Sequence, residues 1–220
     1  MRPASAHQRG LTLVELLIGL ALGLFVVAAA ATLLTGQIRE QRSLAVEQRL
    51  MQELRTASDV IARDLRRAGH WGAAAAALSG ASGPAPNPYA AWSAAPAASD
   101  AIGFRYSRDT LENGIVDANE EFGLRLRNGV VELLLGTAWQ ALTDAGTLTV
   151  DTLRITPSVQ TTSLADHCSD CLAAPCVPRQ ELRSVEVLIT AHATLDPSVV
   201  RSLRSAVRVR NDLVAAGCPA

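Results

Sequence analysis

The sequence predicts an α+β protein in which one long N-terminal helix packs on a C-terminal antiparallel β-sheet domain. Three features predict it: an apolar run near the N-terminus, an amphipathic stretch that continues it without a proline, and short strand-like runs after residue 100. The 220 residues suffice for one domain of ordinary size with an appendage. All 20 basic residues are arginine and the formal charge is −1, which excludes lysine-based catalysis and an overall basic field.

The apolar run covers residues 11–36, and 19 consecutive residues within it carry no charge. At a rise of about 1.5 Å per residue, this part is about 28 Å long and nearly matches a hydrocarbon core of about 30 Å. Arg2 and Arg9 lie just before the run, so residues 1–10 are expected to stay in the cytoplasm. The run therefore predicts a single-pass transmembrane helix, with the rest of the chain outside the cytoplasm.

The carboxylate of Glu15 interrupts the apolar run close to its start. A charged side chain costs about 2.5 to 3.5 kcal/mol at the centre of a bilayer, and such a residue usually has a partner. Two interpretations stay open from this pattern. Glu15 lies at the headgroup level, where the cost is small, or it pairs with a positive group on another subunit.

The residues around Glu15 resemble a known processing signal. A short basic leader followed by Gly10-Leu11-Thr12-Leu13-Val14-Glu15 is similar to the class III signal of type IV pilins and type II secretion pseudopilins. The resemblance implies cleavage between Gly10 and Leu11 by prepilin peptidase, with methylation of the new amine of Leu11. It also implies that Glu15 neutralises the N-terminal amine of a neighbouring subunit in a filament. Leu11 stands where major pilins usually carry phenylalanine, which favours a minor pilin.

The helix is expected to continue past the membrane through residues 37–69. Apolar residues recur there in steps of three or four, as one face of an amphipathic helix requires; they are Val46, Leu50, Leu54, Ala57, Ile61 and Leu65. Gly69 follows two arginines, an order typical of a helix C-terminus. The segment 62–72 resembles the helix end of PilW-type minor pilins, which narrows the resemblance to one branch.

The exported part begins with an Ala/Pro-rich loop over residues 70–100, and a β-sheet domain is predicted for residues 101–220. The strand-like runs are 101–107, 121–127, 130–135, 147–156, 184–195 and 205–210. Asn128-Gly129 between two of these runs indicates a tight hairpin, because both residue types tolerate a positive φ. With 1–10 as leader peptide and 11–36 as transmembrane and assembly segment, this layout resembles the type IV pilin-like fold.

An acidic loop before the hairpin partly fits the calcium-loop template. The residues that fit are Asp109, Asn113, Ile115 (through its backbone carbonyl), Asp117 and Glu120, around the sharp turn at Gly114. Leu111 has no oxygen to offer at the third position of the template, and no helices flank the loop. Two interpretations stay open: a weak extracellular calcium site, or an acidic turn between two strands that binds nothing.

The four cysteines are Cys168, Cys171, Cys176 and Cys218. In an oxidising compartment they are expected to form two disulfides, with the pairing left open among three connectivities. A zinc site and free thiols are the alternatives, although a single CxxC without a second one is a weak zinc pattern.

The sequence contains no nucleophile elbow, HExxH motif, phosphate loop or dinucleotide fingerprint, so no enzyme is predicted and no cofactor apart from calcium. The resemblance implies a minor pilin that primes or caps a type IV pilus. Its implied partners are other minor pilins, the major pilin, prepilin peptidase, the inner-membrane assembly platform and lipid, whereas nucleic acid is not indicated. The alternatives are a minor pseudopilin of a type II secretion system and a periplasmic binding protein whose ordinary signal is cleaved near residues 28–31.

Overall fold

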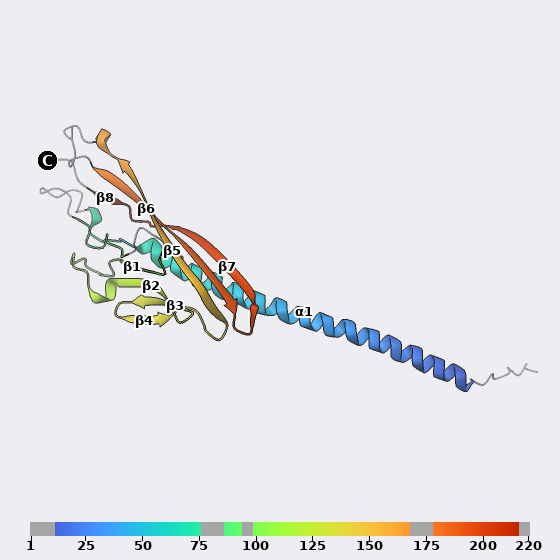
Figure 1. The fold of residues 1–220 in the computed structure, drawn as a ribbon. Coiled ribbons are helices and arrows are strands. Elements are labelled where there is room, and N and C mark those ends of the chain that lie inside the picture. Colours follow the sequence, from blue (N-terminus) through green and yellow to red (C-terminus); the bar gives the residue numbers. More distant parts are fainter. Residues whose placement is uncertain (1–11, 76–85, 94–98, 168–177, 216–220) are drawn as a thin grey trace, which may run out of the picture. The chain divides into compact units, whose positions relative to one another are not determined.

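The computed structural model describes residues 12–75, 86–93, 99–167 and 178–215, and its chain forms two compact units, residues 1–45 and 46–220 (Figure 1). One helix, α1 (Leu13–Arg67), supplies all the described regular structure of the first unit and continues into the second. It covers most of the stretch, residues 11–69, for which the absence of proline and the apolar periodicity predict a helix.

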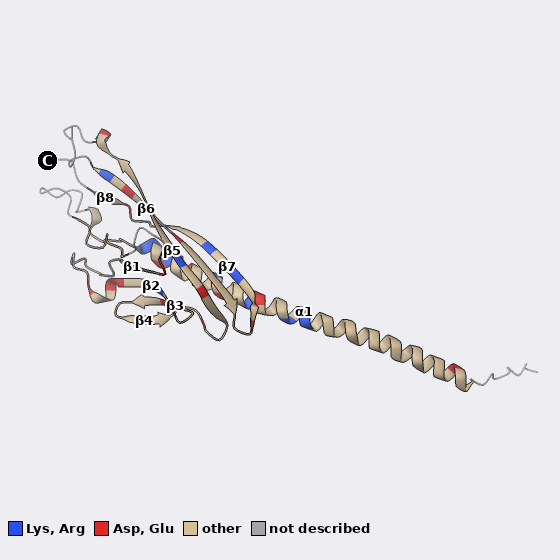
Figure 2. Cartoon of the chain, in the orientation of Figure 1, with Lys and Arg blue, Asp and Glu red and all other residues tan. Residues whose placement is uncertain are grey.

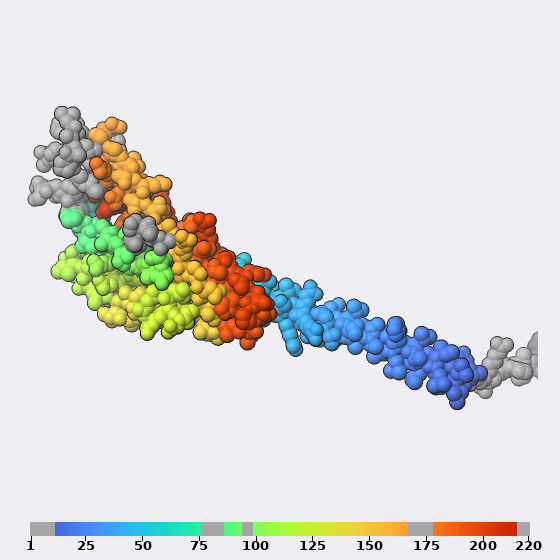
Figure 3. Space-filling model, in the orientation of Figure 1, coloured from blue at the N-terminus to red at the C-terminus, as the bar shows by residue number. Residues whose placement is uncertain are grey.

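The strands of the second unit form two antiparallel sheets, which confirms the predicted α+β class. The first sheet has the order β1 (Ala101–Arg105), β2 (Glu121–Arg127), β3 (Val130–Leu135), β4 (Ala138–Ala141). The second has the order β5 (Leu148–Ser163), β6 (Arg179–Ala193), β7 (Asp196–Arg208), with β8 (Leu213–Ala215) paired to β6. Short 3-10 turns cover Ala118–Glu120 and Ala165–His167. Figure 3 shows the two sheets side by side on one face of this unit, and β5 contacts strands β1, β2 and β3.

The hairpin predicted at Asn128-Gly129 is confirmed. Both residues have a positive φ, 51° and 76°, and they join β2 to β3 in register. Strands β4 and β8 were not expected, because they have four and three residues and no alternating pattern. The strands of the second sheet are longer than predicted, because pairing with β6 extends β5 and β7 beyond the runs expected from the sequence.

The apolar face of the second half of α1 forms the core of this unit together with both sheets. The predicted positions Leu50, Leu54, Ala57, Ile61 and Leu65 are all buried, and Val46 is partly buried against the same cluster. Phe104, Phe122, Ile155 and Ile189 are among the strand residues of this core. The amphipathic pattern therefore predicted correctly which face of the helix is covered.

The end of α1 is closed by residues that lie far away in the sequence. Gly69 has a φ of +72°, as the predicted C-cap requires, and its N–H donates to the carbonyl of Arg105 at 2.7 Å. The amide of Asn211 donates to the carbonyls of Arg67 and Ala68 at 3.3 and 3.1 Å. The two bonds from Asn211 satisfy carbonyls that a helix end leaves without an intrahelical partner.

Candidate functional site

The start of α1 carries a side-chain cap. The backbone N–H of Glu15 donates to Oγ1 of Thr12 at 3.3 Å, and the N–H of Leu16 donates to the carbonyl of Thr12 at 3.2 Å. Thr12 is thus the N-cap and Glu15 stands three residues later, the spacing of a capping box. This cap was not predicted from the sequence, although the pattern Thr-x-x-Glu before an apolar run indicates one.

Glu15 is the one charged side chain at the beginning of a long apolar surface. Within the described residues its carboxylate makes no hydrogen bond or ion pair, and its place in the first turn favours a negative charge. Figure 2 shows the long tan stretch of α1 that follows this acidic position. The structure therefore leaves the carboxylate available for a cation that this part of the chain does not supply.

The apolar side chains that follow are not covered by the protein itself. The large apolar residues between Leu13 and Leu34 are 54% to 75% exposed. The helix is long and apolar enough to cross a membrane. An apolar helical surface of this size needs lipid or neighbouring helices to cover it, because it would promote aggregation if it were exposed to water.

Comparison with protein families identifies the kind of protein. Residues 5–31 match the prokaryotic N-terminal methylation motif, and residues 43–209 match prepilin peptidase-dependent protein B. The chain belongs to the prepilin peptidase-dependent protein B family. Neither curated proteins nor solved structures gave a match to it.

The match to the N-terminal methylation motif marks the N-terminal region as a pilin-like signal, and the apolar helix that follows is of a kind that anchors a chain in a membrane. The chain is therefore a pilin-like minor subunit that depends on prepilin peptidase, and proteins of this kind are generally structural. Gly10 and Leu11, between which cleavage was predicted, lie outside the described residues. The matched motif spans both of them together with the cap Thr12 and with Glu15.

The acidic loop proposed for calcium is held together by its own hydrogen bonds. Glu120 is fully buried, and its carboxylate accepts the N–H groups of Asp117 and Arg108 at 2.9 and 2.7 Å. The hydroxyl of Tyr89, also fully buried, lies 3.1 Å from both Oε2 of Glu120 and the carbonyl of Ile115. Two of the oxygens assigned to a metal are therefore already hydrogen-bonded to the protein.

Oxygens of Asn113 and Asp117 accept hydrogen bonds within the turns of the loop. Oδ1 of Asn113 accepts the N–H of Ile115 at 2.6 Å, and the amide of Asn113 donates to Asp117 at 3.3 Å. Asp109 accepts no hydrogen bond at Oδ2, which is buried. In the described part of the chain no group of three or more His, Cys, Asp or Glu side chains is arranged to hold a metal ion. This geometry favours the alternative of an acidic turn, and calcium binding stays a prediction.

Glu112, which was not predicted as a site residue, is a second side chain that holds the loop in place. Its carboxylate accepts the N–H groups of Gly72 and Gly114, both at 3.0 Å, and the Tyr89 hydroxyl lies 3.1 Å away. Burial alone would raise the pKa of Glu112 and of Glu120, but the hydrogen bonds outweigh it and hold both pKa values below the ordinary range. Burial, with the two carboxylates, raises the pKa of Tyr89, so its hydroxyl keeps its proton.

The predicted disulfides lie outside the described residues, because Cys168, Cys171, Cys176 and Cys218 all do. Their pairing into two disulfides stays a prediction. The two strands that lead to and from the first three cysteines, β5 and β6, are paired along their whole described length.

Proposed function

We propose that the chain is a PilW-type minor pilin that primes or caps a type IV pilus after cleavage between Gly10 and Leu11 and methylation of Leu11. The observation that carries the proposal is the unpaired carboxylate of Glu15 in the first turn of an exposed apolar helix, inside the matched methylation motif. Cleavage would create a positive amine four residues before Glu15.

The mechanism follows from the cost of burying charge. When helices pack in a filament, their apolar surfaces leave water, and both the carboxylate of Glu15 and a free amine lose hydration. Each group is costly alone, and pairing offsets much of that cost. The carboxylate thus favours the axial stagger that places it beside the N-terminal amine of a neighbouring subunit. Pairing makes Glu15 a determinant of register as well as of incorporation.

We also assign a role to each successive segment of the chain. Residues 1–10 are the leader, 11–36 anchor and assemble, and 37–69 continue the helix into the exported domain, with the 70–100 loop and the 101–220 domain beyond. The domain would face the periplasm and then the cell surface. The proposed partners are other minor pilins, the major pilin and the inner-membrane assembly platform.

The test compares Glu15→Ala with Glu40→Ala, which removes an exposed carboxylate from the same helix outside the apolar run. Sheared filaments and membranes are separated and each is probed for the subunit. We expect Glu15→Ala to be processed and present in membranes but depleted from filaments at least about tenfold, whereas Glu40→Ala is incorporated normally. Incorporation of Glu15→Ala at the level of the unchanged chain would refute the assembly role.

A further inference from the structure

Three arginine side chains border a hollow at the C-terminal end of α1. Its volume is about 350 Å³, and the described residues that line it are Arg66, Arg208, Val209 and Arg210. Arg66 lies in the last turn of α1, Arg208 ends β7, and Arg210 follows two residues later. Val209 is fully buried, so the groups that a ligand would meet here are chiefly the three guanidiniums.

Backbone hydrogen bonds hold together the two chain segments that form this hollow. The N–H of Arg210 donates to the carbonyl of Arg66 at 3.1 Å, and the N–H of Val209 donates to the carbonyl of Arg183 at 2.9 Å. The side-chain amide of Asn211 also donates to carbonyls at the end of α1. The fold therefore fixes the backbone positions of the arginines, and a ligand does not have to bring the two segments together, which lowers the cost of binding.

The positive charges of the hollow have one carboxylate beside them. Nη2 of Arg208 lies 3.2 Å from Oδ2 of Asp212, and the same oxygen accepts the side-chain amide of Gln180 at 2.8 Å. Within the described residues, the side chains of Arg66 and Arg210 make no hydrogen bond or ion pair, and both are exposed. Two guanidiniums are therefore left without an anionic partner from this part of the chain.

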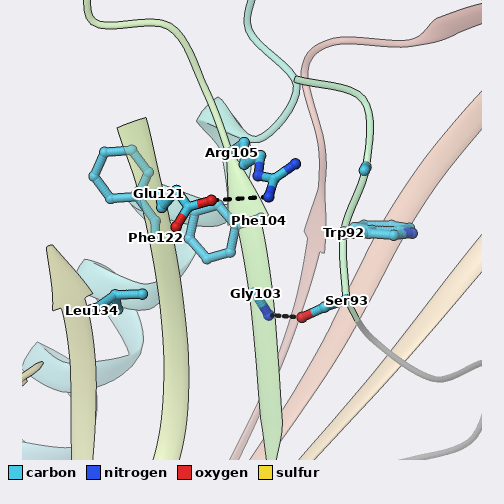
Figure 4. Close-up of a pocket in the computed structure, with 9 residues that line it drawn as sticks. Trp92, Ser93, Gly103, Phe104, Arg105, Glu121, Phe122 and Leu134 are labelled. Carbon is cyan, nitrogen blue, oxygen red and sulfur yellow. Dashed lines mark hydrogen bonds and ion pairs between the residues drawn. The ribbon is translucent and has the colours of Figure 1, made fainter. Parts of the chain in front are cut away.

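A second hollow, on the first sheet, has polar side chains that already bind one another. There Arg105 and Glu121 form an ion pair of 2.9 Å, and Oγ of Ser93 accepts the N–H of Gly103 at 2.9 Å (Figure 4). Because the two charges in that hollow balance, it has no preference for a ligand of either sign. The arginine hollow differs, since its excess of positive charge favours an anion.

The arginine side chains are not needed to cap α1. Cationic side chains are often found at a helix C-terminus, where they interact with the last carbonyls. Here the carbonyl of Arg66 accepts the backbone N–H of Arg210, and the two carbonyls that follow accept the amide of Asn211. The guanidiniums of Arg66 and Arg210 are therefore available to a group from outside the chain.

We infer that this hollow binds a phosphate group through Arg66, Arg208 and Arg210. Guanidinium groups bind oxyanions through paired, charge-assisted hydrogen bonds. A phosphate group offers three or more acceptor oxygens in a tetrahedral arrangement, so guanidiniums from three backbone positions can each reach one. A carboxylate has two oxygens in one plane and satisfies fewer of these donors. A metal cation would be repelled, and an apolar ligand would remove water from the guanidiniums without replacing its hydrogen bonds.

The phosphate is either the free ion or the end group of a phosphate ester, because a hollow of about 350 Å³ is at the small end of ligand sites. The experiment uses the full chain in an uncharged glycoside detergent, since phosphocholine and sulfobetaine headgroups resemble the anion under test. Phosphorus NMR line widths of inorganic phosphate and of methyl phosphate are measured at constant ionic strength, with acetate as competitor. We expect saturable binding with a Kd of about 1 mM at low salt, and no displacement by an equal concentration of acetate.

The variant Arg66→Gln/Arg210→Gln removes two of the three guanidiniums and keeps the backbone hydrogen bond between these positions. Arg55→Gln/Arg154→Gln is the matched control, because both arginines are exposed and neither makes an ion pair within the described residues. The two double variants have the same net charge, so any general attraction of anions changes equally. We expect the first to raise the Kd for phosphate at least about tenfold, because charge-assisted hydrogen bonds are lost, and the control to leave it unchanged.

The inference is overturned if neither phosphate nor methyl phosphate binds, if acetate at equal concentration displaces phosphate, or if the two double variants bind phosphate equally. Binding of methyl phosphate as tightly as inorganic phosphate would support the inference with a phosphate ester as the ligand. Binding of inorganic phosphate alone would support it with the free ion. None of these outcomes bears on the assembly role of Glu15, which the filament experiment tests separately.

Discussion

The hydroxyl of Tyr89 lies 3.1 Å from Oε2 of Glu120, and neither side chain is exposed to solvent. The two residues join the segment 86–93 to the acidic loop that precedes β2. A buried carboxylate is costly unless its oxygens accept hydrogen bonds. Glu120 accepts backbone N–H groups as well as the hydroxyl, so this contact organises the loop rather than straining it.

Glu120→Gln is expected to lower the free energy of unfolding by about 1–3 kcal/mol, because a neutral amide accepts these bonds less well and brings two N–H donors without partners. Glu121→Gln is the control: the neighbouring carboxylate is 46% exposed, and its variant should change stability by at most about 1 kcal/mol. Urea unfolding of the full chain, followed by tryptophan fluorescence, measures both. Equal losses in the two variants would show that burial of Glu120 has no energetic role.

Acid should destabilise the second unit through Glu112 and Glu120. Both pKa values are lowered in the folded protein, so the stabilisation is complete above the unfolded value of about 4.3 and is lost as the pH falls through the folded values. Unfolding free energies measured between pH 7 and pH 3 should fall more steeply for the unchanged chain than for Glu112→Gln/Glu120→Gln. Parallel curves would contradict this assignment.

Gly69 and Gly114 share a φ of +72° but have different surroundings. A Cβ on Gly69 would lie 2.6 Å from Nη2 of Arg183, which is buried and bonded to the carbonyls of Ala90 and Asn211, whereas a Cβ on Gly114 meets nothing within 4 Å. Gly114→Ala should therefore cost about 1–2 kcal/mol from the backbone alone.

Gly69→Ala should cost clearly more, because Arg183 must also move and give up its bonds. Thermal unfolding of the two alanine variants side by side separates the two effects. A loss at Gly69 no larger than that at Gly114 would mean that Arg183 moves aside freely and does not fix the end of α1.

Short sequence patterns correctly predicted the features that depend on residues close together in the chain. The stripe from Leu50 to Leu65 identified the buried face of α1, and Asn128-Gly129 identified its hairpin, because both depend on neighbours within a few residues. The calcium template assigned Glu120 to a metal. It gave no sign of Tyr89, which lies 31 residues away, because the contact exists only after the chain folds.

Other features of the domain were also missed because they depend on residues that meet only after the chain folds. Asn211 caps the C-terminal end of α1 although it lies 143 residues after Ala68, and the residues around it show no pattern that indicates a helix cap. Strands β4 and β8 have four and three residues, too few to show an alternating strand pattern. At the start of α1 the opposite holds, because Thr12 and Glu15 are three residues apart and a search for caps in the sequence would have found them.

The mature N-terminus of the protein purified from membranes tests the central claim most directly. Mass spectrometry of the intact chain and of its N-terminal peptide gives both the first residue and its modification. A chain that begins with N-methylated Leu11 is the result predicted for a pilin-like subunit processed by prepilin peptidase. A chain that begins near Ala31 or Thr32 would contradict it, because conventional signal cleavage removes Glu15 and the helix that would enter a filament.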